Sequence, residues 1–448
     1  MSEFQNTGRP DAGRQSAPRR HHPAADTADG GPGADGAGAG TTEVLRAGTP
    51  QDILAFVPHC LGFTPQESLV LLGLRGARLG ATLRLDLPGA SCAGDSPGLD
   101  SLELISGYAD RITSLLSNDE DTDGVLAVLY TNLVPEEGTP PPYSALMDIL
   151  CSELERHGLI VRDAWLTGNG TWRAYFCTDP GCCPWPGHPT DGIAGSRLGA
   201  ELVYRGSAFA PSLEGSLEGT LRRAGTLRTA AMDARIGEVR RRMEGRWGSP
   251  DVFDEVLAAW DRRMCSATRL PPSEPVDPNP GRNGHEGDAL LLASLECKPV
   301  RDAVLVLAAS GMAAAAQGIR HVLHPDLVPD TPNAGQEPSA LAGQQFRSML
   351  IGRSRSAPDW ERLDAVHSVF CNLLLRAAGE PAAALLTLLG WVEWARGRSS
   401  RAELSLSAAL REVPGYRLAA LLRELLRRGE LPQWALSPLT AWHGGPGA

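Results

Sequence analysis

The sequence contains almost no lysine. Of its 42 basic residues, Lys298 is the single lysine and all the others are arginines. Schiff-base chemistry and the phosphate-binding lysine of a P-loop both need an amine at a particular place. Lys298 lies in LECKPVRD, with no glycine-rich loop before it. This argues against pyridoxal-dependent enzymes and P-loop NTPases.

Several other patterns are also missing. The chain has no H-E-x-x-H metal motif. No uninterrupted run reaches eighteen apolar residues, and the N-terminus lacks the apolar core of a secretory signal, so we expect a cytoplasmic protein without a membrane segment. The net charge of −11 argues against nucleic acid as a partner. In that compartment nine cysteines are expected to be thiols or metal ligands, not a disulfide framework.

Hydrophobic patterning predicts the fold class. Up to about residue 209, strand-length apolar runs alternate with amphipathic helical segments, and two of the runs form hairpins, one turning at Gly168-Asn169-Gly170. Helical periodicity dominates from there on. The sequence therefore predicts an α/β domain, with a mixed sheet and flanking helices, followed by an all-helical C-terminal domain.

Composition shifts divide the chain further. The predicted parts are a disordered Gly/Ala/Pro-rich tail (1–41), the α/β domain (42–210), a helical, Arg-rich connector (211–269), a Pro/Gly-rich linker (270–288) and a helical domain (289–440) with a tetratricopeptide-like helical hairpin near 388–428. A repeat array needs about three units to bury a continuous core, and little more than one is present, so the hairpin is interpreted as packing on its neighbours.

One segment is locally basic. Residues 221–246 contain eight arginines against three acidic residues, a local excess of +5. Weak binding of nucleic acid or another anion is one interpretation. No aromatic residues are interleaved with the arginines, so a solvated or internally paired helix face is the favoured interpretation.

Three cysteines and a histidine fall within the fifteen residues YFCTDPGCCPWPGHP (175–189). The favoured interpretation is a rigid turn, because Asp179 can bond its own backbone two residues on and the prolines restrict φ. A zinc site would use Cys177, Cys182, Cys183 and His188, although adjacent ligands are awkward. A redox or nucleophilic site would use the same thiols. The candidate functional loop comprises Trp172, Arg173, Tyr175, Cys177, Asp179, Cys182 and Cys183.

Three stretches carry a resemblance to a known family. They are LRAGTPQDILAFVPHCLGFTPQESLVLLGLRG (45–76), TWRAYFCTDPGCCPWPG (171–187) and LLGWVEWARGRSSRAELSLSAALREVPGYRLAALLRELL (388–426). The sequence resembles an uncharacterised actinobacterial family, domain of unknown function 4192, whose pattern W-x-x-Y-x-C-x4-CCP-x-x-G it matches. The resemblance implies an actinobacterial, intracellular protein and supplies no activity. His188 is not part of that pattern, so a metal common to the family would need its fourth ligand elsewhere, for example His59 or His157.

These observations favour a cytoplasmic module that binds a protein or small-molecule partner, because catalytic motifs are missing and helical domains present grooves. The alternative is an enzyme or a metal or redox site centred on the CTDPGCCP loop. No cofactor is predicted beyond zinc in the metal interpretation. The sequence assigns neither the partner's identity nor an oligomeric state.

Overall fold

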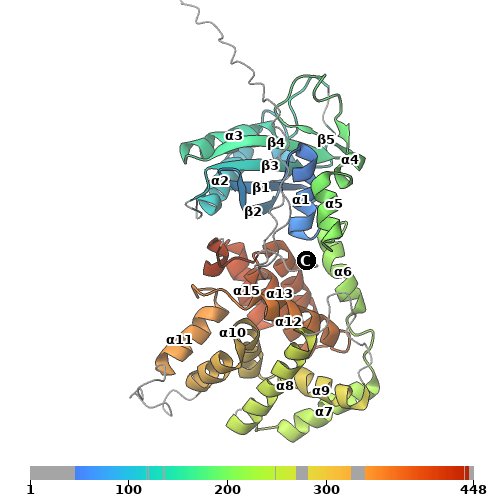
Figure 1. Cartoon of the computed structure of the whole chain (residues 1–448), viewed down its shortest axis with the longest axis vertical. Coiled ribbons are helices and arrows are strands. Elements are labelled where there is room, and N and C mark those ends of the chain that lie inside the picture. Colours follow the sequence, from blue (N-terminus) through green and yellow to red (C-terminus); the bar gives the residue numbers. More distant parts are fainter. Residues whose placement is uncertain are drawn as a thin grey trace, which may run out of the picture. The chain divides into compact units, whose positions relative to one another are not determined.

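A six-stranded mixed sheet organises the N-terminal part of the computed structural model (Figure 1). The structure describes residues 46–442 except 118, 120, 135–136, 248, 269–280, 324–338 and 438. The sheet order is β2-β1-β3-β4-β5-β6, and only β3 and β4 pair in parallel. The strands are β1 (Ser68–Arg75), β2 (Arg78–Asp86), β3 (Gly124–Tyr130), β4 (Ile160–Gly168), β5 (Thr171–Ala174) and β6 (His188–Pro189).

Helices cover both faces of this sheet (Figure 1). Alternate residues of a strand point to opposite faces, so Leu69 and Leu71 pack with α2 (Leu99–Leu116) and α3 (Ser144–Arg156), whereas Val70 and Leu72 pack with α1 (Pro50–Leu61). Shorter elements are η1 (Ala90–Cys92), α4 (Asp191–Ala194) and α5 (Arg197–Tyr204). Two apolar layers around one sheet confirm the predicted α/β class.

The second predicted hairpin is confirmed at its turn. Asn169 and Gly170 both adopt positive φ, 50° and 76°, as a two-residue turn between antiparallel strands requires. β4 and β5 pair from Trp165 opposite Ala174 to Gly168 opposite Thr171. The turn thereby directs the chain into the cysteine-containing segment that follows β5.

Helices make up the C-terminal part and share one core (Figure 1). They are α6 (Leu213–Arg223), α7 (Ala230–Met243), α8 (Pro250–Thr268), α9 (Gly281–Ser294), α10 (Lys298–Leu323), α11 (Ser339–Leu350), α12 (Trp360–Leu374), α13 (Glu380–Ala395), α14 (Ser399–Glu412), α15 (Arg417–Arg427) and η3 (Gln433–Leu436). Every residue of α13 from Pro381 to Ala395 is buried. α13 is therefore the helix around which the others pack, and the all-helical prediction is confirmed.

Three tryptophans close this core at the C-terminal end of α13. Trp391, Trp394 and Trp434 lie with each pair of ring centroids 6.3 Å apart. Each indole N–H donates to a main-chain carbonyl oxygen, those of Leu350, Glu430 and Ala395 respectively. The predicted hairpin corresponds to α13 and α14, joined at Gly397, whose φ is 77°. It packs on its neighbours, as expected of a single unit.

The predicted domain boundaries differ from the structure in two places. The C-terminal residues of the predicted linker are helical, since α9 begins at Gly281 and contributes buried Leu292 to the core. The predicted connector is not separate, because α7 and α8 bury a stripe of apolar residues in that same core. The predicted tail and residues 270–280 of the linker lie outside the described residues.

One helix in the described part of the chain, α10, is long and apolar enough to cross a membrane by length and composition, with a mean hydropathy of 1.5. The sequence did not predict it, because the helix contains no uninterrupted run of eighteen apolar residues. Its most apolar window is 56% buried, as in the core helix of a soluble protein, and Gly311 interrupts its helical backbone. α10 is thus weak evidence for a membrane span.

The arginine-rich segment (221–246) includes α7, and the arginines of this helix lie on the face away from the core. Met232, Ile236, Val239 and Met243 are buried at helical spacing, so the arginines occupy the remaining positions. Arg228 pairs with Asp233 and Arg240 pairs with Glu296. Part of the basic excess is therefore paired within the chain.

Candidate metal site at the cysteine loop

The loop between β5 and β6 is attached to the sheet at both ends. Tyr175 continues the pairing of β5 by donating its N–H to Ala164 O at 2.8 Å, and its hydroxyl donates to Pro142 O at 2.7 Å. At the other end Trp172 pairs with His188, and Thr190 donates its N–H to Gly170 O. Residues 176–187 are therefore a loop whose two ends are held against neighbouring strands.

Asp179 organises the interior of this loop. Its side-chain Oδ1 accepts the Gly181 N–H at 2.8 Å, and its main-chain oxygen accepts the N–H groups of Cys182 and Cys183 at 3.2 and 2.8 Å. The predicted turn, in which Asp179 bonds the backbone two residues on, is confirmed. It reverses the chain, so that the vicinal cysteines face back toward Cys177.

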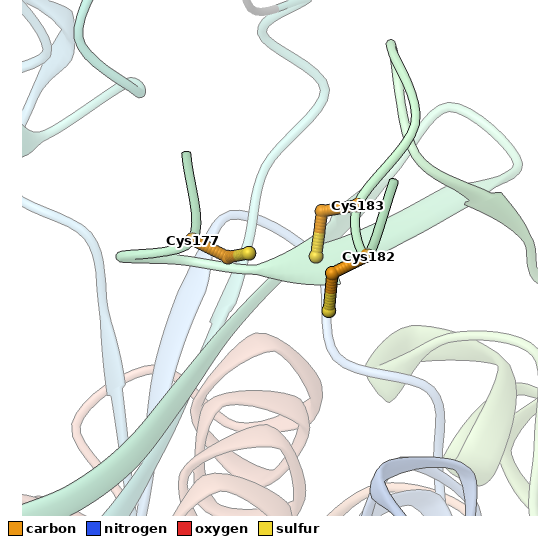
Figure 2. A group of neighbouring side chains, drawn as sticks. All are labelled: Cys177, Cys182 and Cys183. Carbon is orange, nitrogen blue, oxygen red and sulfur yellow. The ribbon is translucent and has the colours of Figure 1, made fainter. Parts of the chain in front are cut away.

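Three sulphur atoms converge in this loop. The Sγ atoms of Cys177, Cys182 and Cys183 all lie within 4.8 Å of one another, and Figure 2 shows the three side chains gathered in one group. Cys183 is buried, Cys177 is partly exposed and Cys182 is exposed. All nine cysteines of the chain are free thiols. The three cysteines are placed where they could hold a metal ion, with one side of the group open to solvent.

The sulphurs also shift one another's protonation. A backbone hydrogen bond with Asp179 and the side chain of Cys183 lower the pKa of Cys177 below its usual value. Interactions with Cys177 and Cys183 raise the pKa of Cys182 to about 11, because a second thiolate beside the first is disfavoured. Without a cation, Cys177 therefore loses its proton more easily than Cys182, and a second thiolate in the group is disfavoured.

The histidines considered as fourth ligands lie elsewhere. His188 Nε2 lies 2.9 Å from Cys182 O, and its ring stacks on Trp172 with a centroid separation of 4.9 Å. His59 Nδ1 hydrogen-bonds Ser207 Oγ, and His157 Nδ1 lies 3.0 Å from Glu153 O. Among the described residues no His, Asp or Glu joins the three sulphurs. The chain brings three of the four expected zinc ligands together.

Other residues of the candidate loop hold the cysteine segment in place. Arg173 Nη2 donates to Cys177 O at 2.9 Å, and its guanidinium lies over the ring of Trp185 at 5.2 Å. Trp172 is buried in the core on the α1 face of the sheet. Sequence reasoning missed Trp185; an aromatic residue directly after the Cys-Cys-Pro run is the pattern that could have indicated it. Arg173 thus joins the main chain of Cys177 to the ring of Trp185.

A family model matches residues 50–334 and 338–433, the greater part of the chain. It describes the domain of unknown function DUF4192. The chain belongs to this family. No curated protein and no solved structure matches the chain. Family membership confirms the resemblance carried by the cysteine loop and the C-terminal helices.

Proposed function

We propose that the cysteine loop is a zinc site formed by the thiolates of Cys177, Cys182 and Cys183, and that the protein uses the metal's fourth position to bind a ligand. The convergence of the three sulphurs carries this proposal. A tetrahedral zinc ion with Zn–S bonds of about 2.3 Å holds its sulphurs about 3.8 Å apart. The observed separations, all within 4.8 Å, need only a small contraction.

Charge and exposure support the same conclusion. Three thiolates and one divalent cation leave a single negative charge. The Arg173 guanidinium is held in the same loop by its hydrogen bond to Cys177 O. Cys182 is exposed, so the side of the metal away from buried Cys183 faces solvent. Sites with three protein ligands keep a position for water or an incoming group, whereas structural sites use four. The proposed function is therefore zinc-dependent binding of a thiol or imidazole, from a protein side chain or a small molecule.

The metal content tests the first half of this proposal. Native mass spectrometry of the full chain, prepared with reductant and one added equivalent of zinc, is expected to show one zinc ion. Cys182→Ser and Cys183→Ser are expected to lose it, while Cys151→Ser, a matched change at a partly exposed cysteine on α3, retains it. Zinc retained in both loop variants, or a wild-type chain at its bare thiol mass, contradicts the proposal. A mass lower by two hydrogens favours a redox disulfide instead.

Cobalt substitution tests the open position. Cobalt(II) adopts the same tetrahedral geometry, and its visible absorption responds to the fourth ligand. Adding imidazole or a small thiol to the cobalt-loaded chain is expected to shift the absorption bands saturably. Bands that do not respond to either ligand would mean that the fourth position is closed, and the site would then be structural.

A further inference from the structure

A second cysteine lies in the helical part, in a setting unlike that of the loop. Cys371 and His367 are one turn apart on α12, and Cys371 Sγ lies 3.9 Å from His367 Nδ1, within hydrogen-bond reach for sulphur. On the other side of the ring, His367 Nε2 lies 3.3 Å from Oε1 of Glu393, which belongs to α13. A thiol, an imidazole and a carboxylate are thus aligned in series.

Glu393 is held firmly in this arrangement. Its side chain is only 3% exposed, and Arg396 Nη1 contacts Oε1 at 3.0 Å. Arg401 Nε lies 3.1 Å from Oε2 but without hydrogen-bond geometry, so Oε2 accepts no hydrogen bond within the described residues. Arg396 is itself paired with Asp364. The carboxylate therefore has a fixed position facing the imidazole.

The charges favour a thiolate and an imidazolium. Burial lowers the pKa of His367, and so does the positive charge of Arg396. Cys371 and Glu393 raise it by more, so the pKa of His367 is about 9. Burial raises the pKa of the Cys371 thiol, and so does the negative charge of Glu393. His367 and a hydrogen bond with Thr220 of α6 lower it by more, so the pKa of Cys371 lies below its usual value. Cys371 is partly exposed and packs against the helical core, as Cys297 does.

We propose that Cys371 is a nucleophile that reacts with an electrophilic carbon, with His367 as its proton acceptor and Glu393 as the residue that positions the imidazole. The same order of thiol, imidazole and a third group that accepts a hydrogen bond from the imidazole activates cysteine nucleophiles on unrelated folds. In the step the thiolate lone pair forms the S–C bond, and the leaving group departs with the electrons of the bond it loses. The proton held on His367 is available to that leaving group. The site is independent of the cysteine loop.

The reactivity of Cys371 toward iodoacetamide, from which iodide leaves, tests the proposal. The full chain is alkylated at pH 6 under reducing conditions, and each cysteine is followed by peptide mass spectrometry. Cys151 and Cys297 are internal controls, because burial raises the pKa of each. Cys371 is expected to react at least about tenfold faster than either, since the thiolate is the reactive form.

Two variants separate activation from mere exposure. His367→Gln is expected to slow Cys371 at pH 6 by about tenfold or more while Cys297 keeps its rate, which also reports intact folding. Thr220→Val, at a partly exposed position on α6, is expected to slow Cys371 by a few fold without disturbing α12 or α13. A wild-type Cys371 that reacts no faster than Cys297, or that is unaffected by His367→Gln in a chain with unchanged Cys297, overturns the proposal.

Discussion

His188 Nε2 donates its hydrogen bond to the main-chain oxygen of Cys182, 2.9 Å away, and the ring packs on Trp172. Nε2 carries the proton and so offers no lone pair to a metal, and His188 is not grouped with the three sulphurs through either ring nitrogen. His188 therefore holds the vicinal cysteines in place through the backbone, while the three sulphurs lie together without it.

Replacing His188 by alanine tests this distinction. We expect His188→Ala to retain one zinc ion per chain, because none of the three thiolates is removed. The lost hydrogen bond is expected to weaken zinc by about tenfold at most, since a single such bond contributes on the order of 1 kcal/mol. Zinc content by mass spectrometry and affinity by chelator competition are the measurements. Complete loss of zinc, as expected for Cys182→Ser, would place His188 among the ligands.

Asp179 offers a paired test of loop organisation. Asp179→Ala removes the side-chain oxygen that accepts the Gly181 N–H but keeps the two bonds to the main-chain oxygen, so zinc is expected to bind roughly fivefold more weakly. Asp179→Asn keeps a side-chain oxygen and is expected to bind as the wild type does. Chelator competition on the two variants measures the difference. Equal weakening in both would implicate the charge of Asp179 rather than its turn.

Zinc affinity is expected to fall as pH falls. Zinc binds thiolates, and the pKa of Cys182 is raised to about 11 by Cys177 and Cys183, so binding must displace its proton throughout the neutral range. The dissociation constant should therefore rise at least about tenfold for each unit between pH 8 and pH 6. Chelator competition at three pH values gives the slope. A constant affinity across this range would exclude thiolate ligands.

Gly187 is expected to tolerate no side chain. A Cβ at this position would lie 2.7 Å from Trp172 O, which is main chain and cannot move without breaking the pairing of β5 with β6. Gly187→Ala should destabilise the loop by about 1–3 kcal/mol and weaken zinc binding accordingly. Gly192→Ala, where a Cβ would meet open space, is the matched control. Thermal unfolding and zinc affinity should change in the first variant alone.

Glu393 should make the helical part sensitive to acid. Burial alone raises its pKa, but Arg401, His367 and Arg396 hold it well below the usual value of 4.5. A lowered folded-state pKa contributes stability that is present above about pH 4.5 and is lost as pH falls toward the folded value. Tryptophan fluorescence should report a decreasing midpoint of urea unfolding between pH 5 and pH 3.

Two variants check the origin of that decrease. Glu393→Gln should be destabilised at pH 7 by about 3 kcal/mol, because the arginines around it lose their buried counter-charge, and its midpoint should vary less with acid. Glu361→Gln, at an exposed position in the first turn of α12, should follow the wild type. An acid transition that persists unchanged in Glu393→Gln would assign the effect to other carboxylates.

Local sequence determined much of the fold and part of the site. Gly168-Asn169-Gly170 has the residues that a two-residue turn requires, and alternation in the strands sets which side chains face each helix layer. Asp179 and the residues after it likewise form the predicted turn, because an Asx turn depends only on neighbours in sequence. These features follow from short-range sterics and hydrogen bonding.

Tertiary structure decided the rest, because it depends on surfaces that meet only after packing. α9 begins inside a stretch with linker composition, since its apolar end is buried in the helical core. His367 and Cys371 are one helical turn apart and could be paired from spacing, but only the packing of α13 against α12 brings Glu393 to the far side of the imidazole. The cysteine loop is a second example. The side chains of adjacent residues tend to diverge, but the backbone bonds made by Asp179 bring Cys182 and Cys183 close to Cys177.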